Sequence, residues 1–311
     1  ISIFCGLMLF AITNNYTTAV AAMFVMGIGG GMSQGNAMAL VADLYKGKKQ
    51  TSACNFSQAF FGVGAILSPI IVGSFIKYNV NWKYAFFLVA LVSLLSACII
   101  FKALSMKYEV PVLDVKKSKS WLSLIVDKKV IILCVTIALY VGAEVGQANW
   151  LATYFEQDLS ATSSFAASSI AFFWAGTSFG RLAGAWAAKY LNEVKLISIA
   201  FIISAFVQQF LILINFPIQA ALLTFMLGVF LGPIYPTIVS YAGKLYPTQS
   251  GTVFGIVVAA GALGGAIFPP AIGWLADFEG MRKALFLCVL LLAGGLVIIS
   301  FLRKQTSKIE V

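Results

Sequence analysis

Long apolar runs separated by short polar gaps dominate the chain. The runs approach the ~20 residues that a helix needs to cross a ~30 Å hydrocarbon layer, and they lack the alternation of membrane barrel strands. This pattern predicts an all-α polytopic membrane protein. The expected segments are 1–13, 18–44, 52–77, 83–104, 129–155, 164–188, 195–215, 218–244, 251–277 and 284–302.

Most gaps between these segments are short, as in a bundle whose neighbouring helices run antiparallel. The gap at 105–128 is longer, polar and rich in lysine. It is the expected cytoplasmic linker between two halves, at 1–104 and 129–311.

The amino-acid composition narrows the classes of function that the chain can have. Of the 311 residues, 60% are hydrophobic and 10% are charged, and the chain has no histidine. Without histidine or closely spaced cysteines, the sequence lacks the usual parts of a hydrolase, a metal enzyme or a thiol redox protein. The five cysteines lie in or beside apolar runs and are interpreted as small packing residues. We therefore expect no enzyme activity, no cofactor and no metal.

The net charge of +10 comes from basic residues in the gaps rather than on a soluble face, which argues against a nucleic-acid partner. Placing the 45–51 gap in the cytoplasm leaves only Lys77, Lys83, Arg282 and Lys283 outside, of 21 Lys and Arg. That distribution follows the positive-inside rule. It predicts a plasma (inner) membrane protein with a cytoplasmic linker and C-terminus.

An internal repeat appears when the chain is shifted against itself by 201 positions. Identities between residues 31 and 71 include Tyr45 with Tyr246 and Pro69 with Pro270. Two parallel repeats joined by a linker are the plan of major facilitator transporters. The shift leaves 128–201 without a counterpart. We therefore expect a fragment holding helices three to six in 1–104 and helices seven to twelve in 129–311.

Uncharged polar residues interrupt two apolar runs of the first half. The stretch from Gly27 to Asn36 combines closely spaced glycines, typical of helix packing, with the amide of Asn36. In the next run, Asn55 and Gln58 are three residues apart and share one helix face. Polar side chains at mid-membrane depth find partners or line a wet cavity, so these amides are candidates for a solute path.

Glu144 is the only carboxylate well inside an apolar run. Gln147 follows it by three residues, within reach of a side-chain hydrogen bond, and Asn149 lies in the same stretch. A buried ionisable group in a membrane indicates function by default, here proton coupling. The alternative is a neutral Glu144 held by a neighbouring helix for structure.

Two further features lie in the second half. Arg181 is interpreted as a structural tie to carbonyls or to an acidic partner, with a direct functional role as the alternative. Tyr235-Pro236-Thr237 is expected to break its helix in mid-run, with protein or a cavity beside the freed carbonyl.

Together these stretches resemble the fucose and hexose proton symporter family of the major facilitator superfamily. By that resemblance, Asn36, Gln58 and Tyr235 approach a sugar cavity, to which the expected substrate-binding set adds Gln147 and Asn149. The resemblance also implies gating or packing roles for Gly62, Gly64 and Pro69. The same roles are expected of Arg181 and Pro236.

The sequence departs from that family at three positions. Met32 stands where the family has a proton-coupling carboxylate, and Phe61 replaces a second polar residue of the fifth helix. Glu144 stands where the family can have a glutamine, which makes it the candidate for the titrating role.

The predicted function is alternating-access transport of a small polar solute, a monosaccharide, coupled to a proton across the lipid bilayer. Sodium coupling stays open, since a carboxylate with nearby oxygens also holds a hard cation. The alternatives are an exporter of drugs or metabolites and, in another class, a non-transporting sensor or scaffold. The solute, the direction of transport and the oligomeric state are left open by the sequence.

Overall fold

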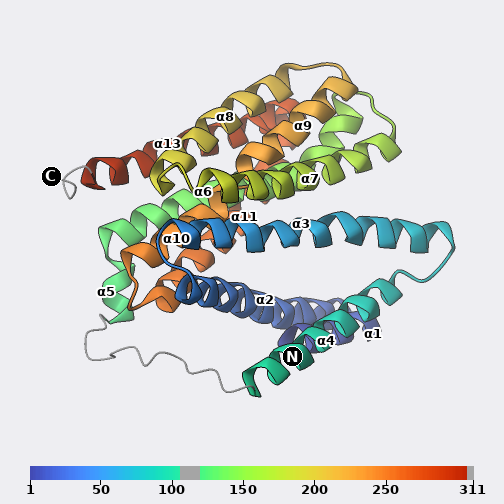
Figure 1. The fold of residues 1–311 in the computed structure, drawn as a ribbon. Coiled ribbons are helices and arrows are strands. Elements are labelled where there is room, and N and C mark those ends of the chain that lie inside the picture. Colours follow the sequence, from blue (N-terminus) through green and yellow to red (C-terminus); the bar gives the residue numbers. More distant parts are fainter. Residues whose placement is uncertain (106–119, 307–311) are drawn as a thin grey trace. The chain divides into compact units, whose positions relative to one another are not determined.

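The computed structural model describes residues 1–105 and 120–306, and every regular element in these ranges is a helix (Figure 1). The helices are α1 (Ser2–Ile12), α2 (Tyr16–Leu44), α3 (Lys48–Lys77), α4 (Lys83–Ser105), α5 (Trp121–Ile125), α6 (Lys128–Gln157), α7 (Ser163–Ala187), α8 (Glu193–Leu213), α9 (Pro217–Leu231), α10 (Ile234–Leu245), α11 (Ser250–Glu279), α12 (Met281–Ala284) and α13 (Phe286–Thr306).

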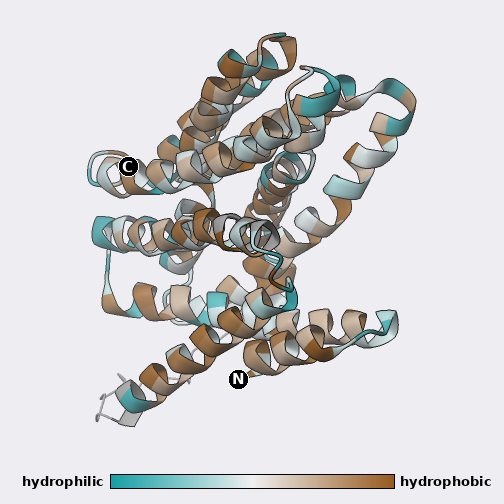
Figure 2. Ribbon diagram, turned by 90° about the vertical axis from the view of Figure 1, so that its right-hand side faces the viewer, coloured by the Kyte–Doolittle hydropathy of each residue, from teal (hydrophilic) through white to brown (hydrophobic). Residues whose placement is uncertain are grey.

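All ten expected segments coincide with these helices, and the predicted all-α membrane fold is confirmed. Among the described residues, seven helical stretches are long and apolar enough to span a bilayer. Hydrophobic residues fill the helix bodies while hydrophilic ones gather mostly at helix ends and turns (Figure 2). Most of the expected linker, at 106–119, lies outside the described residues, and its C-terminal part contains the short helix α5.

The internal repeat is visible in the helix bounds. The stretch from the start of α9 to the end of α10 is displaced by 201 residues from α2, and α11 is displaced by 202 residues from α3. Of the identities found in the sequence, Pro69 and Pro270 fall on equivalent helices, and Tyr45 and Tyr246 each directly follow the end of one.

The chain divides into two compact units, each described by itself. The first holds residues 1–37 and 67–118, and within it α1 packs against α4 and the first part of α2. Ser2 donates a hydrogen bond to the carbonyl of Val25 at 2.7 Å, and Lys83 donates to the carbonyl of Thr13 at 3.1 Å. These bonds fix α1 between its two neighbours.

The second unit holds residues 38–66 and 119–311, so it contains the end of α2, most of α3 and all helices from α5 onward. In it, α6 packs against α11 and α13, α7 against α9, and α8 against α13 and α9. Several of these helices begin at side-chain caps: Asp127 accepts from the amide of Lys129 at 3.0 Å, and Asn192 from that of Lys195 at 2.9 Å. Each such cap stabilises a helix start by about 1 kcal/mol.

Glycines set the close approach of α7 and α9. They recur every fourth residue, at 176, 180 and 184 on α7 and at 228 and 232 on the facing segment. A Cβ at Gly176 or Gly180 would collide with the carbonyl of Phe225 or Val229, and one at Gly228 with that of Phe173. Because helices in lipid associate through packing rather than the hydrophobic effect, this backbone contact is a main source of their association.

The break in the eighth expected segment, 218–244, lies at Gly232-Pro233, not at Tyr235-Pro236-Thr237. Helix α9 ends at Leu231 and α10 begins at Ile234, which places Pro236 in the first turn of α10. A first helical turn tolerates proline because its amide has no intrahelical partner there. The break was expected at Pro236 but lies at the preceding proline, Pro233, so its predicted position was wrong.

Candidate functional site

One face of α6 carries a buried polar row in the middle of the second unit. Tyr140, Glu144 and Gln147 are spaced by four and three residues, and all three side chains are buried. Asn149 is exposed, since two residues beyond Gln147 the helix has turned by about 200°. Glu144 and Gln147 thus share a buried face of α6, and Asn149 lies apart from them. The hydrogen bond expected between Glu144 and Gln147 is not formed, since the amide nitrogen of Gln147 has no partner among the described residues.

Glu144 faces Arg181 of α7. A guanidinium nitrogen of Arg181 lies 3.5 Å from Oε1 of Glu144, and the two side chains are 4% and 8% exposed. This is a buried ion pair, whose desolvation cost is large and is offset only by mutual attraction and further hydrogen bonds. Within the described part of the chain, Oε1 of Glu144 and Nε of Arg181 have no hydrogen-bond partner. Electrostatic attraction therefore holds the ion pair, although not all of its polar atoms are hydrogen-bonded.

Arg181 also binds α3. Its Nη1 donates to the backbone carbonyl of Gln58 at 2.9 Å, and its guanidinium lies 5.2 Å from the ring centre of Phe61. The sequence predicted a tie to carbonyls or to an acidic partner, and Arg181 contacts one of each, the carbonyl of Gln58 and the carboxylate of Glu144. Arg181 links α3, α6 and α7.

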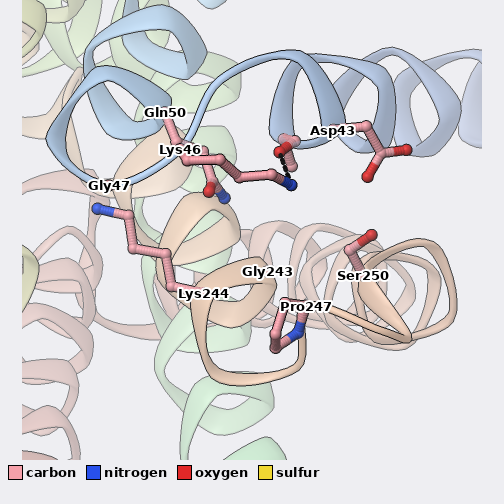
Figure 3. A pocket seen from close by; sticks show the side chains of 9 residues that line it. Asp43, Lys46, Gly47, Gln50, Gly243, Lys244, Pro247 and Ser250 are labelled. Atoms are coloured by element: carbon pink, nitrogen blue, oxygen red, sulfur yellow. Dashed lines mark hydrogen bonds between the residues drawn. The ribbon is translucent and has the colours of Figure 1, made fainter. Parts of the chain in front are cut away.

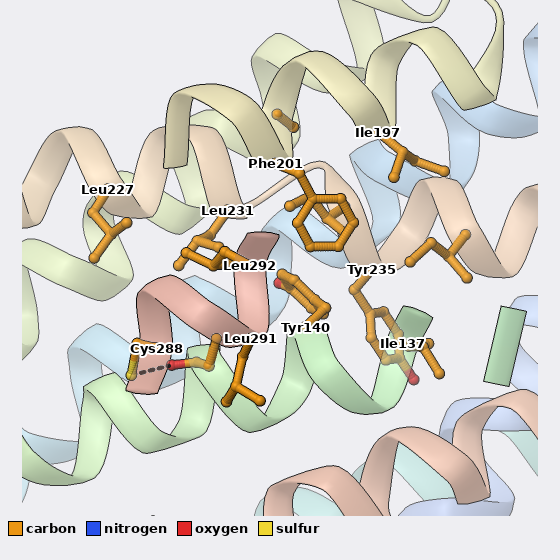
Figure 4. Close-up of a cluster of buried hydrophobic side chains, with 14 of the residues drawn as sticks. Ile137, Tyr140, Ile197, Phe201, Leu227, Leu231, Tyr235, Cys288, Leu291 and Leu292 are labelled. Atoms are coloured by element: carbon orange, nitrogen blue, oxygen red, sulfur yellow. Dashed lines mark hydrogen bonds between the residues drawn. The ribbon is translucent and has the colours of Figure 1, made fainter. Parts of the chain in front are cut away.

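Two tyrosines lie next to this pair. The rings of Tyr140 and Tyr235 are 6.5 Å apart and tilted by 43°, and both are buried. Figure 4 shows them near Ile137 of α6 and Phe201 of α8, so the two rings also contact the apolar core. The hydroxyl of Tyr140 has no hydrogen-bond partner among the described residues.

A second polar pair continues along α6. Nε2 of Gln208 on α8 donates to Oε1 of Gln147 at 2.9 Å, and Gln208 is fully buried. Sequence reasoning missed Gln208. The signal available was a pair of neighbouring glutamines inside an apolar run, the same kind of signal that marked Asn36.

On α3, Asn55 and Gln58 share a buried face, as their spacing predicted. The side-chain amide of Asn55 donates to Oγ1 of Thr237 on α10 at 3.1 Å. Tyr235 and Pro236 are buried in the first turn of that same helix. The start of α10 is thus joined to α3 by side chains that the sequence had marked separately.

The remaining predicted residues lie in different surroundings. A Cβ at Gly62 would meet the side chain of Ser178, so α3 and α7 touch there, whereas Gly64 is exposed with open space around it. Asn36 is exposed and belongs to the first unit. The side chain of Pro69 lies outside the described residues.

A second polar cluster joins the helix ends near the start of α3. Glu193 of α8 forms an ion pair with Lys244 of α10 and accepts from Oγ1 of Thr51 at 2.8 Å. Thr51 also lies 3.0 Å from Oγ of Ser240, whose carbonyl accepts from Gln50 at 3.1 Å. Sequence reasoning missed this cluster, because its members sit at helix ends where charged residues are ordinary.

Beside this cluster is a small cavity of ≈ 170 Å³ (Figure 3). Its lining includes Asp43, Lys46, Gln50 and Lys244. The ammonium of Lys46 turns back to the carbonyl of Ala42 at 3.0 Å. The cavity is therefore a gap among helix ends, away from the residues of the buried row on α6.

The chain resembles known membrane proteins along most of its length. The family model of the Major Facilitator Superfamily matches residues 1–192 and, in an overlapping second match, 133–310. Protein TsgA homolog of Buchnera aphidicola is 22% identical over 257 residues, covering 81% of this chain and 63% of the relative. Protein TsgA of Salmonella paratyphi B is 22% identical over 284 residues, covering 90% and 69%. The chain thus spans less than two thirds of the Buchnera relative.

Solved structures share the fold. The transporter FucP in the outward conformation superposes with a TM-score of 0.78 at 20% identity, covering 96% of this chain and 82% of FucP. A variant of the E. coli fucose:proton symporter FucP gives 0.79 at 20% identity, covering 96% and 83%. The human organic anion transporter MFSD10 gives 0.73 at 16% identity, covering 96% and 74%.

Proposed function

Because the chain belongs to the Major Facilitator Superfamily, a family of transporters rather than enzymes, we propose that it is a secondary active transporter. It moves a small polar solute, a monosaccharide, by alternating access and in symport with a proton. Its two repeated halves are 1–104 and 129–311, joined by a cytoplasmic linker. The C-terminus is cytoplasmic as well, in a plasma (inner) membrane, in line with the positive-inside distribution of its lysines and arginines.

The observation that carries the proposal is the buried pair of Glu144 and Arg181. A proton on Glu144 removes its charge and with it the attraction that holds the guanidinium. Arg181 keeps its bond to the carbonyl of Gln58, so protonation changes how α6 is tied to α3 and α7. This arrangement can act as a coupling switch, because one proton on Glu144 breaks the ion pair through which Arg181 links α6 to α3 and α7.

The solute site lies beside this switch in the proposal. The phenols of Tyr140 and Tyr235 and the amides of Gln58 and Gln147 supply hydrogen-bonding groups, and the aromatic rings cover apolar sugar faces. The likeness to a fucose:proton symporter supports this class of solute. Asn36 and Asn149 stay candidates for the same set.

The test is uptake of a hexose and deoxyhexose panel by the protein in liposomes, with and without a proton gradient. We expect gradient-driven uptake of one sugar in the wild type. Glu144→Gln should abolish this accumulation while exchange of sugar across the membrane persists, because exchange needs no net proton movement. Glu156→Gln, an exposed carboxylate on the same helix, is the control and should keep both activities.

Loss of exchange together with accumulation would assign Glu144 to the structure rather than to coupling. Sugar uptake absent under every gradient would reject the symporter. A sodium gradient in place of the proton gradient distinguishes the two coupling ions.

Export of an amphipathic organic solute is the second candidate. The observation in its favour is Phe61, which stands at a polar position of the sugar symporters and packs on both Arg181 and the ring of Trp174, 5.6 Å away. An aromatic and cationic surface of this kind fits an apolar anion better than a sugar. Drug-stimulated proton release from the same liposomes, in the absence of sugar uptake, would favour it.

A further inference from the structure

A groove on the surface of the second unit lies where α3 begins and α7 ends, away from the buried row on α6. Its volume is ≈ 640 Å³, within the range of about 300–1,000 Å³ typical of small-molecule pockets. Small residues separate an apolar wall from a basic rim. The lining residues are Tyr45, Lys48, Lys49, Ser52, Ala53, Phe56, Leu182, Ala185, Trp186 and Lys189.

The rim of the groove is cationic. Lys48 and Lys49 stand in the first turn of α3, and Lys189 follows the end of α7. The ammonium of Lys48 donates to the carbonyl of Lys189 at 3.0 Å, which holds the two chain segments together. Among the residues that the structure describes, the lining contains three lysines and no acidic side chain. Three like charges in one groove repel one another unless an anion lies between them.

The wall of the groove is apolar and aromatic. Phe56 is 54% exposed and Trp186 is 62% exposed, on α3 and α7 respectively. Trp186 packs against Tyr190 with ring centres 5.1 Å apart, at the end of the helix. Tryptophan and tyrosine at the ends of membrane helices are typical of the bilayer interface, with headgroups on one side and acyl chains on the other.

From this arrangement we propose that the groove is a binding site for an anionic phospholipid. The phosphate and its headgroup lie among Lys48, Lys49 and Lys189, and the acyl chain runs along Phe56, Leu182 and Trp186. Basic pockets between membrane helices bind such headgroups through the same combination of charge and apolar contact. The lipid bridges α3 and α7, which at this end are joined by the bond from Lys48 to the carbonyl of Lys189.

A second groove supplies an internal comparison. It has a volume of ≈ 240 Å³ and an apolar lining that includes Phe165, Phe172 and Phe225, without a charged residue. It offers acyl chains a surface but offers headgroups no charge. A preference for anionic lipid should therefore be confined to the lysine-rimmed groove.

The experiment is quenching of tryptophan fluorescence by phospholipids with brominated acyl chains, using the protein in vesicles of phosphatidylcholine with a small fraction of brominated lipid. The signal of Trp186 is the difference between wild type and Trp186→Phe. Brominated phosphatidylglycerol should quench this signal at a fraction about tenfold or more below that needed for brominated phosphatidylcholine, since each lysine near an anionic surface contributes to binding.

Three variants test the cause. Replacing Lys48, Lys49 and Lys189 by glutamine should abolish the preference, whereas replacing the three by arginine should retain it. Replacing Lys102, Lys128 and Lys195 by glutamine removes the same charge elsewhere and should leave the preference unchanged. A reporter at the apolar groove, Phe172→Trp in the Trp186→Phe background, should be quenched equally by both lipids.

Equal quenching of Trp186 by the two lipids would overturn the proposal. So would a preference that survives the triple glutamine variant, or one that the control triple loses as well. Inorganic phosphate at millimolar concentration should not displace the brominated lipid; displacement would assign the groove to a soluble anion.

Discussion

Two of the ion pairs in the second unit show how the same chemistry differs with its position along the helices. Glu144 and Arg181 meet in the middle of α6 and α7 with side chains 4–8% exposed, and Oε1 of the carboxylate accepts no hydrogen bond from the described residues. Glu193 and Lys244 meet at helix ends, are 12–20% exposed, and the carboxylate also accepts from Thr51. The carboxylate at the helix ends is thus completed by the hydroxyl of Thr51, whereas Oε1 of Glu144 has no such donor among the described residues.

That difference indicates different uses. A carboxylate with several donors is stabilised as an anion and acts as a clamp between helices. A buried carboxylate with one cationic partner changes the local balance of charge when that partner moves or when a proton arrives. The central pair, Glu144 with Arg181, is therefore suited to switching. The pair at the helix ends, Glu193 with Lys244, is suited to holding helices together.

Arg181→Gln should have the largest effect. Removing the cation leaves the charge of Glu144 buried without a partner, which lowers the free energy of unfolding by about 3–5 kcal/mol. Thermal unfolding in detergent measures the loss. The double variant Glu144→Gln with Arg181→Gln should recover most of it, and a double variant no more stable than the single one would show that the pair is not the cause.

Gln208→Leu should come next. It leaves the amide oxygen of Gln147 buried without its donor, at a cost of about 1–3 kcal/mol in unfolding free energy. Replacing both glutamines by leucine removes the unpaired group and should restore stability. If the double variant loses twice as much as the single one, the two side chains act independently.

Glu193→Gln should cost less than about 1 kcal/mol, because partial exposure lets water screen the pair with Lys244. The difference between wild type and variant should shrink further at about 1 M salt, where the Debye length is about 3 Å. The same salt should leave the effect of Arg181→Gln unchanged. Equal salt sensitivity of the two pairs would contradict the proposed difference in depth.

Glu279→Gln should change the melting temperature by no more than the error of measurement. Its carboxylate pairs with Lys283 at 2.7 Å, but the two side chains are 56% and 72% exposed. A clear destabilisation would mean that exposure in the isolated protein underestimates how deeply this helix end is covered.

The sequence predicted the helices well because length and apolar content decide them in a membrane. It also marked Glu144 and Arg181, since charges inside apolar runs are rare. Their pairing was not readable, because 37 positions separate them and the rotation of two helices decides whether they meet. Whether the two side chains meet depends on how α6 and α7 pack, and glycine contacts fix the position of α7 against α9.

The errors have equally specific reasons. Asn149 shares a motif with Gln147 but points to another side of α6, since two residues are more than half a helical turn. Gln208 and Gln209 are adjacent, so the pattern could not say which one faces inward. The break before α10 lies at Gly232-Pro233. Pro236 stays helical because a proline in the first turn of a helix costs no backbone hydrogen bond.

The glycine contacts between α7 and α9 have a mechanical consequence. Backbones that touch leave no side chains to rearrange, so the two helices keep their spacing and act as one stiff lever. Arg181 sits near the end of this lever, and the break at Gly232-Pro233 separates it from α10. A displacement of the lever relative to α3 would thus strain the bond from Arg181 to Gln58 and the bond from Lys48 to Lys189, so the two distances together are a gauge of how far the helices have moved.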